Sequence, residues 1–216
     1  MNLSFFDETF KTYMVDFIKE TMEAYSEDVD DAAYDLINDL EILEDKFKRE
    51  DFEVRSGASK LVFLEDSKVY KVYFDEECLC ETEPTVYKRA KAKGLEDYFA
   101  KTGELHEESF CVDDFVVKFW YYEQEKVNQD DPSNHFKSDS FDAWRTFPKA
   151  LRNLKTPDCV DNYESFVNCC AMSGRSDVQK LFSFLSKLNI SDLHTGNFFV
   201  NRGCPVLIDF SRYCGG

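Results

Sequence analysis

Positively charged residues are scarce in this sequence. The 216-residue chain has 26 Lys and Arg against 43 Asp and Glu, which gives a formal net charge of −17 at pH 7. Such a chain repels the phosphates of nucleic acids, so we expect no direct binding to DNA or RNA. The same charge is compatible with a basic protein partner, with a surface that competes for a nucleic-acid-binding groove, or with a role in solubility alone.

Long apolar runs and export signals are also lacking. No stretch approaches the roughly 20 apolar residues of a transmembrane helix, and the opening "MNLSFFDETFKTYMVDF" has no basic region followed by an unbroken apolar run. We therefore expect a cytoplasmic protein without a membrane partner. Its eight cysteines include no CxxC pair, so their spacing does not match usual zinc sites. We expect reduced thiols that are mostly small buried hydrophobic residues.

Hydrophobic periodicity divides the chain into segments. Helical spacing of apolar residues predicts two helices over residues 3–48, separated by the turn and N-cap segment "SEDVDD". The period then becomes that of strands, and residues 51–74 predict three short antiparallel strands with a tight turn at "EDS". A helix is expected over residues 83–103, with Pro84 in its first turn and a break at Gly94.

The rest of the chain predicts one more hairpin, a loop and a helical part. Residues 109–125 read as two strands, and residues 126–140 as a polar linker. Helices are expected over 163–173 and 176–189, the second capped by Ser176, before a closing hairpin over 197–210. The predicted class is α+β, with a five-stranded antiparallel sheet interrupted by one helix after its third strand.

The closing segment carries a pattern typical of phosphate transfer. Asp192 stands five residues before Asn197, and Asp209 follows twelve residues later at the end of an apolar strand. Transfer of phosphate from ATP requires little covalent work, so the site must position charges: a lysine on the phosphates, metal ligands, and a carboxylate that orients the attacking hydroxyl. In protein kinases the catalytic Asp precedes the metal-binding Asn by this spacing.

On these motifs the chain resembles the protein-kinase-like superfamily over roughly residues 52–212. "DLHTGN" resembles the "DLHPGN" of aminoglycoside- and choline-type kinases, and also the catalytic loops of bacterial effector kinases. The likeness is greatest to the early Ser/Thr protein kinases of T-seven-like podophages. The resemblance implies a truncated two-lobed kinase-like fold: a helical extension (1–50), an N-lobe (51–124) and a minimal helical C-lobe with the catalytic loop and a DFG-like strand (125–216).

The resemblance also implies roles for the polar residues of the closing segment. Asp192 would orient the acceptor hydroxyl and take its proton, while Asn197 and Asp209 would hold Mg²⁺. His194 stands where many protein kinases have a phosphate-contacting lysine, and would either bind the transferred phosphate or play a structural role in the loop.

A lysine and a glutamate are implied upstream. "Val-Tyr-Lys71-Val" resembles the third-strand lysine motif, and alternation along the strand turns Lys71 toward a cleft, where it would contact the α- and β-phosphates of ATP. Glu83 would pair with this lysine, with Glu81 as the fallback. The neighbouring Lys60 and Lys68 are expected to be solvated.

The nucleotide loop and the hinge complete the implied ATP site. "RSGASK" places only Gly57 and Ser59 where protein kinases usually have three glycines, which predicts a weakened grip on the phosphates. After the fifth strand, "WYYEQE" with Tyr121 and Tyr122 is expected to form the hinge whose backbone meets adenine.

Several positions depart from the family pattern. Ile190 and Ser191 replace the usual His-Arg pair, so no partner for a phosphorylated activation loop is expected, and Ser211 replaces the last glycine of DFG. Only seven residues follow Asp209, which leaves no room for an activation segment or the later C-lobe helices. Recognition of the acceptor would then come from the N-terminal helices, from residues 125–165 or from a docking partner.

Three functions remain open at the level of sequence. The first is an ATP- and Mg²⁺-dependent Ser/Thr protein kinase of minimal type, phage-encoded, that acts in the bacterial cytoplasm on host proteins such as the transcription or translation machinery, or on itself. The second is a small-molecule phosphotransferase. The third is an acidic pseudokinase that binds and inhibits a host factor.

Overall fold

A computed structural model of the chain forms two compact units that are each built from two separate stretches of sequence. Unit 1 comprises Met1–Cys78 and Gly103–Lys126, and unit 2 comprises Leu79–Thr102 and Val127–Gly216. The structure describes residues 5–25, 39–57, 59–74, 82–127, 166, 169–170, 173–188, 190, 193, 196–201 and 204–210.

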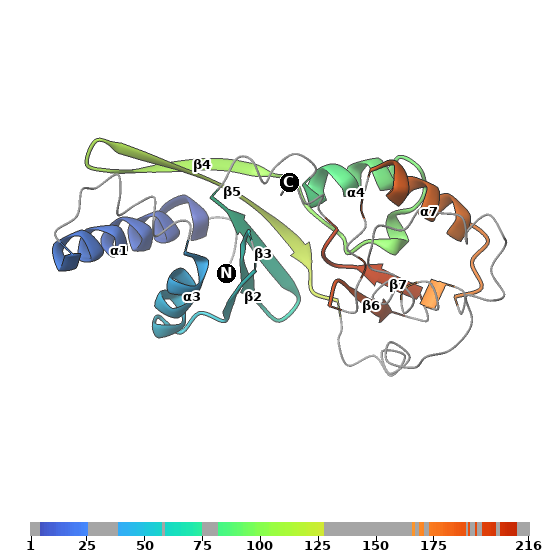
Figure 1. Cartoon of the computed structure of the whole chain (residues 1–216), viewed down its shortest axis with the longest axis horizontal. Coiled ribbons are helices and arrows are strands. Elements are labelled where there is room, and N and C mark those ends of the chain that lie inside the picture. Colours follow the sequence, from blue (N-terminus) through green and yellow to red (C-terminus); the bar gives the residue numbers. More distant parts are fainter. Residues whose placement is uncertain are drawn as a thin grey trace. The chain divides into compact units, whose positions relative to one another are not determined.

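Unit 1 consists of helices and one antiparallel sheet (Figure 1). Its elements are η1 (Phe5–Thr9), α1 (Phe10–Tyr25), α3 (Leu40–Arg49), β1 (Val54–Ser56), β2 (Leu61–Leu64), β3 (Lys68–Tyr73), β4 (His106–Val112) and β5 (Phe115–Glu125). The strand order is β1-β2-β3-β5-β4, and every neighbouring pair is antiparallel. The predicted five-stranded sheet is therefore confirmed. The turn at "EDS" is also present, since the Glu65 N–H donates to the Lys68 carbonyl at 2.9 Å.

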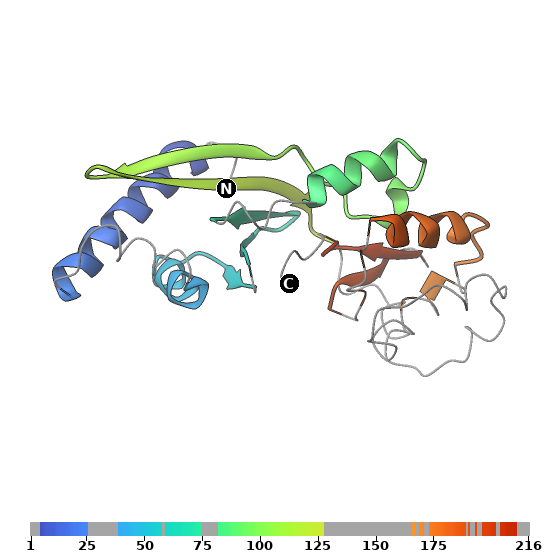
Figure 2. The ribbon, with the colours of Figure 1, turned by 45° about the horizontal axis from the view of Figure 1, so that its top comes forward.

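One face of this sheet is covered by the N-terminal helices, with α1 packed against β4 (Figures 1 and 2). The predicted apolar stripe of the first helix is confirmed, because its members Phe6, Phe10, Met14 and Ile18 are all fully buried. In the second helix Leu43 and Phe47 are buried in the same core, and Asp39 caps the helix by accepting from the Ile42 N–H at 3.2 Å. The predicted cap segment "SEDVDD" lies outside the described residues.

Unit 2 contains α4 (Glu83–Lys91), η3 (Glu96–Tyr98), α7 (Val178–Lys187), β6 (Phe198–Asn201) and β7 (Cys204–Leu207). The closing hairpin is thus present, and the expected break at Gly94 falls after α4, where the glycine has φ +66°. The predicted cap of α7 is wrong by one residue, since Asp177 and not Ser176 is its N-cap. Most of the predicted linker and of the predicted helix over 163–173 lie outside the described residues. Within that predicted helix, Phe166, Cys169 and Cys170 are described and are helical.

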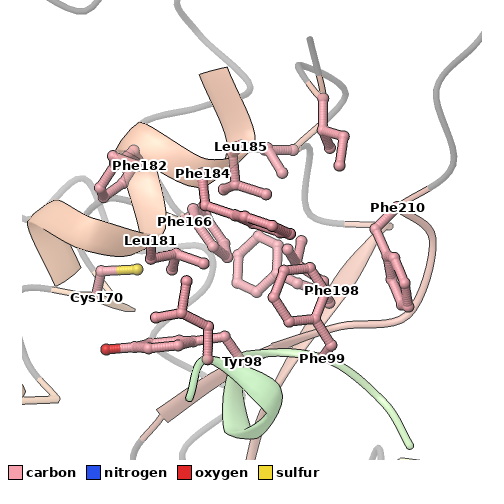
Figure 3. Close-up of a cluster of buried hydrophobic side chains, with 14 of the residues drawn as sticks. Tyr98, Phe99, Phe166, Cys170, Leu181, Phe182, Phe184, Leu185, Phe198 and Phe210 are labelled. Carbon is pink, nitrogen blue, oxygen red and sulfur yellow. The ribbon is translucent and has the colours of Figure 1, made fainter. Parts of the chain in front are cut away.

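The core of unit 2 gathers apolar side chains from every one of its described elements (Figure 3). The ring of Phe99 lies 5.0 Å from that of Phe210, and Phe166 lies 5.3 Å from Phe198, both in edge-to-face arrangements. The Ala100 N–H donates to the Leu207 carbonyl at 2.8 Å, so the segment after η3 runs beside β7. Both strands of the closing hairpin are therefore fixed at its open end.

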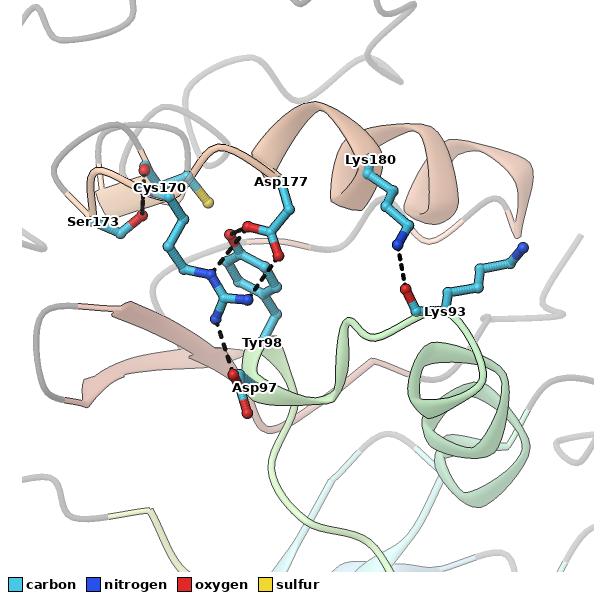
Figure 4. Close-up of polar contacts among 8 residues, drawn as sticks. Lys93, Asp97, Tyr98, Cys170, Ser173, Asp177 and Lys180 are labelled. Atoms are coloured by element: carbon cyan, nitrogen blue, oxygen red, sulfur yellow. Dashed lines mark hydrogen bonds and ion pairs between the residues drawn. The ribbon is translucent and has the colours of Figure 1, made fainter.

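A group of polar contacts joins η3 to the start of α7 (Figure 4). Arg175 donates to both carboxylate oxygens of Asp177, at 3.0 and 2.7 Å, and its guanidinium lies 4.1 Å from the centre of the Tyr98 ring. The Tyr98 hydroxyl donates to the same carboxylate at 2.7 Å. The bond from Arg175 is the main reason that the pKa of Asp177 is lowered, while burial raises the pKa of Tyr98.

Two further expectations concern reduced cysteines and the lack of a membrane-spanning helix. Of the four described cysteines, all free thiols, Cys169 and Cys170 are buried, Cys204 is half-buried and Cys111 is exposed. Within the described part of the chain, no helix has the length and apolar character that spanning a membrane requires.

Candidate functional site

The hairpin of β6 and β7 brings Asn197 and Asp209 together. Phe198 pairs with Leu207 at the open end of the hairpin, so Asn197 just before β6 and Asp209 just after β7 lie side by side. The Asn197 carbonyl accepts the N–H of Ile208 at 2.9 Å and the N–H of Asp209 at 3.3 Å. Asn197 is buried and Asp209 is half-buried. Twelve residues of separation along the chain thus become direct backbone contact.

Two described residues on either side of Asp192 in the sequence have buried apolar side chains. Ile190 and Leu193 are both buried in the core of unit 2. Phe198 and Phe210 belong to the same core (Figure 3). The Ile190 N–H also donates to the Leu185 carbonyl at 3.0 Å, which ties Ile190 to the end of α7. Asp192 and His194, the predicted base and phosphate-contacting residue, lie outside the described residues.

The Asn197 and Asp209 pair has the donor chemistry that Mg²⁺ prefers. An amide oxygen and a carboxylate are hard ligands, and Mg²⁺ is commonly held by one or two carboxylates together with substrate phosphates. Among the described residues, no cluster of three or more His, Cys, Asp or Glu side chains is arranged to hold a metal. Asn197 and Asp209 are therefore the residues at this end of the hairpin whose side chains could hold Mg²⁺ together with ligands from a bound phosphate.

Lys71 lies on the face of the sheet opposite the N-terminal helices. Its neighbours on β3, Tyr70 and Val72, belong to the aromatic core of unit 1, so alternation turns Lys71 to the other face, where it is 5% exposed. Its cross-strand partners are Val62 and Tyr122. The predicted alternation is confirmed.

Glu83 is fully buried at the start of α4, directly before Pro84. This matches the expectation that the proline places the glutamate at the helix start and not in its middle. Glu83 belongs to unit 2 and Lys71 to unit 1, so their pairing stays a prediction. The fallback Glu81 lies outside the described residues.

Helix α3 holds the start of the predicted nucleotide loop. The Glu44 carboxylate accepts both the N–H and the hydroxyl of Ser56, the residue before Gly57, and is also bonded by Lys48. Gly57 is exposed, its N–H donates to the Lys60 carbonyl at 2.8 Å, and Ser59 is half-buried. The loop is thus a closed turn whose first residue is fixed by the N-terminal extension.

Glu44→Gln is expected to destabilise unit 1 by about 1–2 kcal/mol, because it weakens charge-assisted hydrogen bonds to Ser56 and Lys48. Those bonds lower the pKa of Glu44 from 4.5 to about 2, and the bond from Lys48 has the largest effect. The folded-state pKa lies below the unfolded one, so this stabilisation is present above pH 4.5 and is lost as the pH falls toward 2.

Urea unfolding of wild type and Glu44→Gln at pH 7 and at pH 3 would measure this contribution. The difference in the free energy of unfolding between the two proteins should narrow at the lower pH. Asp45→Asn, at an exposed position of the same helix, serves as the control and should stay within about 0.5 kcal/mol of wild type at pH 7. A constant difference between Glu44→Gln and wild type at both pH values would contradict the assignment.

Two placements differ from expectation. Tyr121 and Tyr122 lie inside β5, which continues to Glu125, and not in a connection after it. Tyr121 stacks on Phe6 at 4.5 Å in the helix-covered core, whereas Tyr122 faces the Lys71 side. The prediction that Lys60 is solvated is wrong, since its side chain is 7% exposed. Lys68 is exposed as predicted and pairs with Glu123 at 2.7 Å.

Compared with models of protein families, with curated proteins and with solved structures, the chain matches none. Its function must therefore be argued from the chemistry of its own residues.

Proposed function

We propose that this protein is a minimal ATP- and Mg²⁺-dependent kinase that transfers phosphate to Ser or Thr hydroxyls of proteins. The observation that carries the proposal is the hairpin contact between Asn197 and Asp209, in which one carbonyl accepts from the residues at and before the aspartate. A kinase-type site requires two metal-binding residues with oxygen ligands and a base close to them. Asn197 and Asp209 have such oxygens and are in backbone contact, and Asp192 stands five residues before Asn197.

Residues upstream of the closing motif, a lysine in unit 1 and a glutamate in unit 2, add independent support. A sheet of five antiparallel strands carries a buried lysine on its third strand, and a helix with a buried glutamate in its first turn follows that strand in the sequence. Protein kinases use a third-strand lysine and a helix glutamate in these roles. A chance match to the closing motif would not supply these upstream residues in the same order.

Each residue then has a defined task. Asp192 orients the acceptor hydroxyl and accepts its proton, and Lys71 holds the α- and β-phosphates. Asn197 and Asp209 hold Mg²⁺, which supplies neutralisation of charge on the β- and γ-phosphates when it is bound. Burial of Asn197 and of the core residues beside it keeps this end of the hairpin rigid, as positioning requires.

Incubation of the purified full chain with γ-labelled ATP and Mg²⁺ tests the proposal. The reaction is run with the protein alone and with a bacterial lysate, beside Asp192→Ala at equal concentration. We expect label on protein Ser or Thr residues with wild type, and at least a roughly hundredfold loss with the variant, because a general base contributes about 10²–10⁴-fold.

The products also separate this proposal from the other two functions. Label that appears on a metabolite and on no protein would identify a small-molecule phosphotransferase. A lack of label on any product would overturn both kinase functions. In that case a lysate protein that is captured equally by wild type and Asp192→Ala would favour the acidic binding protein.

A further inference from the structure

Lys60 is a buried lysine for which the proposed kinase chemistry has so far assigned no role. It ends the loop after β1, its side chain is 7% exposed, and its Nζ lies 5.9 Å from the centre of the Tyr73 ring. Lysine is seldom buried in proteins because removing its charge from water is costly. Its low exposure places the Lys60 ammonium beside the Tyr73 ring and away from open solvent.

The side chain of Lys60 reaches the same face of the sheet as Lys71. Tyr73 stands two residues after Lys71 on β3, so both side chains project from one face. Tyr122 lies directly opposite Lys71, and its hydroxyl is 3.1 Å from that of Tyr73. Lys71 on β3 and Lys60, from the loop before β2, therefore lie on the face of the sheet that carries this pair of buried tyrosines.

Hydrogen bonds in the loop fix the backbone position from which the Lys60 side chain projects. Glu44 holds Ser56 at the start of the loop, and the Gly57 N–H donates to the carbonyl of Lys60 itself. Between these two points Ser59 is half-buried and makes no hydrogen bond to any of the described residues. Its N–H and hydroxyl are therefore donors that an anion on this side of the loop could use.

We infer that Lys60 is a second cationic binding residue for the polyphosphate chain of a nucleoside triphosphate, beside Lys71. This inference rests on the proposed kinase function and deepens it. A triphosphate carries several negative charges, and an ammonium group at a site of low exposure interacts with them more strongly than one in water. A loop with one glycine brings few backbone N–H groups close to a phosphate. A lysine at the end of the loop supplies positive charge in place of those N–H groups.

Equilibrium binding of ATP and of adenosine to wild type, Lys60→Met and Lys68→Met tests the inference. Methionine keeps most of the length and the apolar stem of lysine and removes the ammonium group, with its charge and its hydrogen-bond donors. We expect Lys60→Met to bind ATP roughly tenfold more weakly, the loss of one charge-assisted contact, and adenosine as wild type does. Lys68→Met is the matched control, because Lys68 is exposed and pairs with Glu123, and should bind both ligands as wild type does.

The outcomes distinguish the inference from the function on which it rests. If wild type and a folded Lys60→Met bind ATP with equal affinity, the inference is overturned and the kinase proposal still stands. Wild type that binds no ATP would overturn both. If Lys60→Met shows no cooperative thermal transition, Lys60→Gln, which keeps a polar head group, replaces it with the same expectation. Retention of tight ATP binding in Lys60→Arg would add support, since arginine keeps the charge.

Discussion

Asp209→Asn is expected to lower the rate of phosphate transfer by roughly 10²–10³-fold at saturating ATP, the range seen when one preorganised charge-stabilising group is removed. The variant keeps the size of the side chain and removes the negative charge that would hold Mg²⁺. The backbone contact between the Asp209 N–H and the Asn197 carbonyl does not involve the side chain, so the hairpin should stay folded.

The measurement is the initial rate of transfer over a titration of Mg²⁺, with a thermal melt of each protein. A metal ligand should raise the Mg²⁺ concentration needed for half-maximal rate, whereas a residue of purely structural importance would lower the melting temperature instead. Asp114→Asn, an exposed position in the turn between β4 and β5, is the control and should keep the wild-type rate. A rate for Asp209→Asn within about threefold of wild type, without a change in Mg²⁺ dependence, would remove Asp209 from the site.

Phe10→Ala is expected to destabilise unit 1 by about 3–5 kcal/mol. Phe10 is fully buried, and its ring lies 5.0 Å from that of Phe119 on β5 and 5.5 Å from that of Phe47 on α3. Its removal leaves a cavity where α1 and α3 meet the sheet, and the rigid strands cannot close around it.

Chemical denaturation of the full chain, followed by circular dichroism, would measure this loss. The matched control is Ile42→Ala on α3, because Ile42 is 46% exposed and its truncation should cost less than about 1 kcal/mol. A loss for Phe10→Ala that is no larger than that of the control would mean that the N-terminal helices do not stabilise the sheet.

The sequence predicts the elements well where one periodic pattern decides them. The stripe from Phe6 to Ile18, the alternation around Lys71 and the hairpin that ends at Asp209 all follow from local spacing, and each is found in the structure. The contact between Asn197 and Asp209 also follows, because an antiparallel hairpin necessarily brings its two ends together.

What the sequence does not predict depends on contacts between distant residues. Asp177 caps α7 in place of Ser176 while its side chain bonds Tyr98, which lies 79 positions away in the sequence. The bond between Glu44 and Ser56 requires α3 to pack against β1, and no local motif signals it. Tyr121 sits in a run of four aromatic residues that are all buried, so both faces of β5 are apolar and alternation cannot mark where the strand ends.

The way the chain is divided between the two units has a consequence for its synthesis. Residues 79–102 belong to unit 2 but leave the ribosome before β4 and β5, which complete unit 1. The apolar side chains of α4 and η3, such as Val86 and Tyr98, must then wait for residues 166–210 to emerge before their core can form. During that interval the nascent chain carries exposed hydrophobic surface, the kind of segment that chaperones bind. We expect its folding yield to depend on translation rate and chaperone supply.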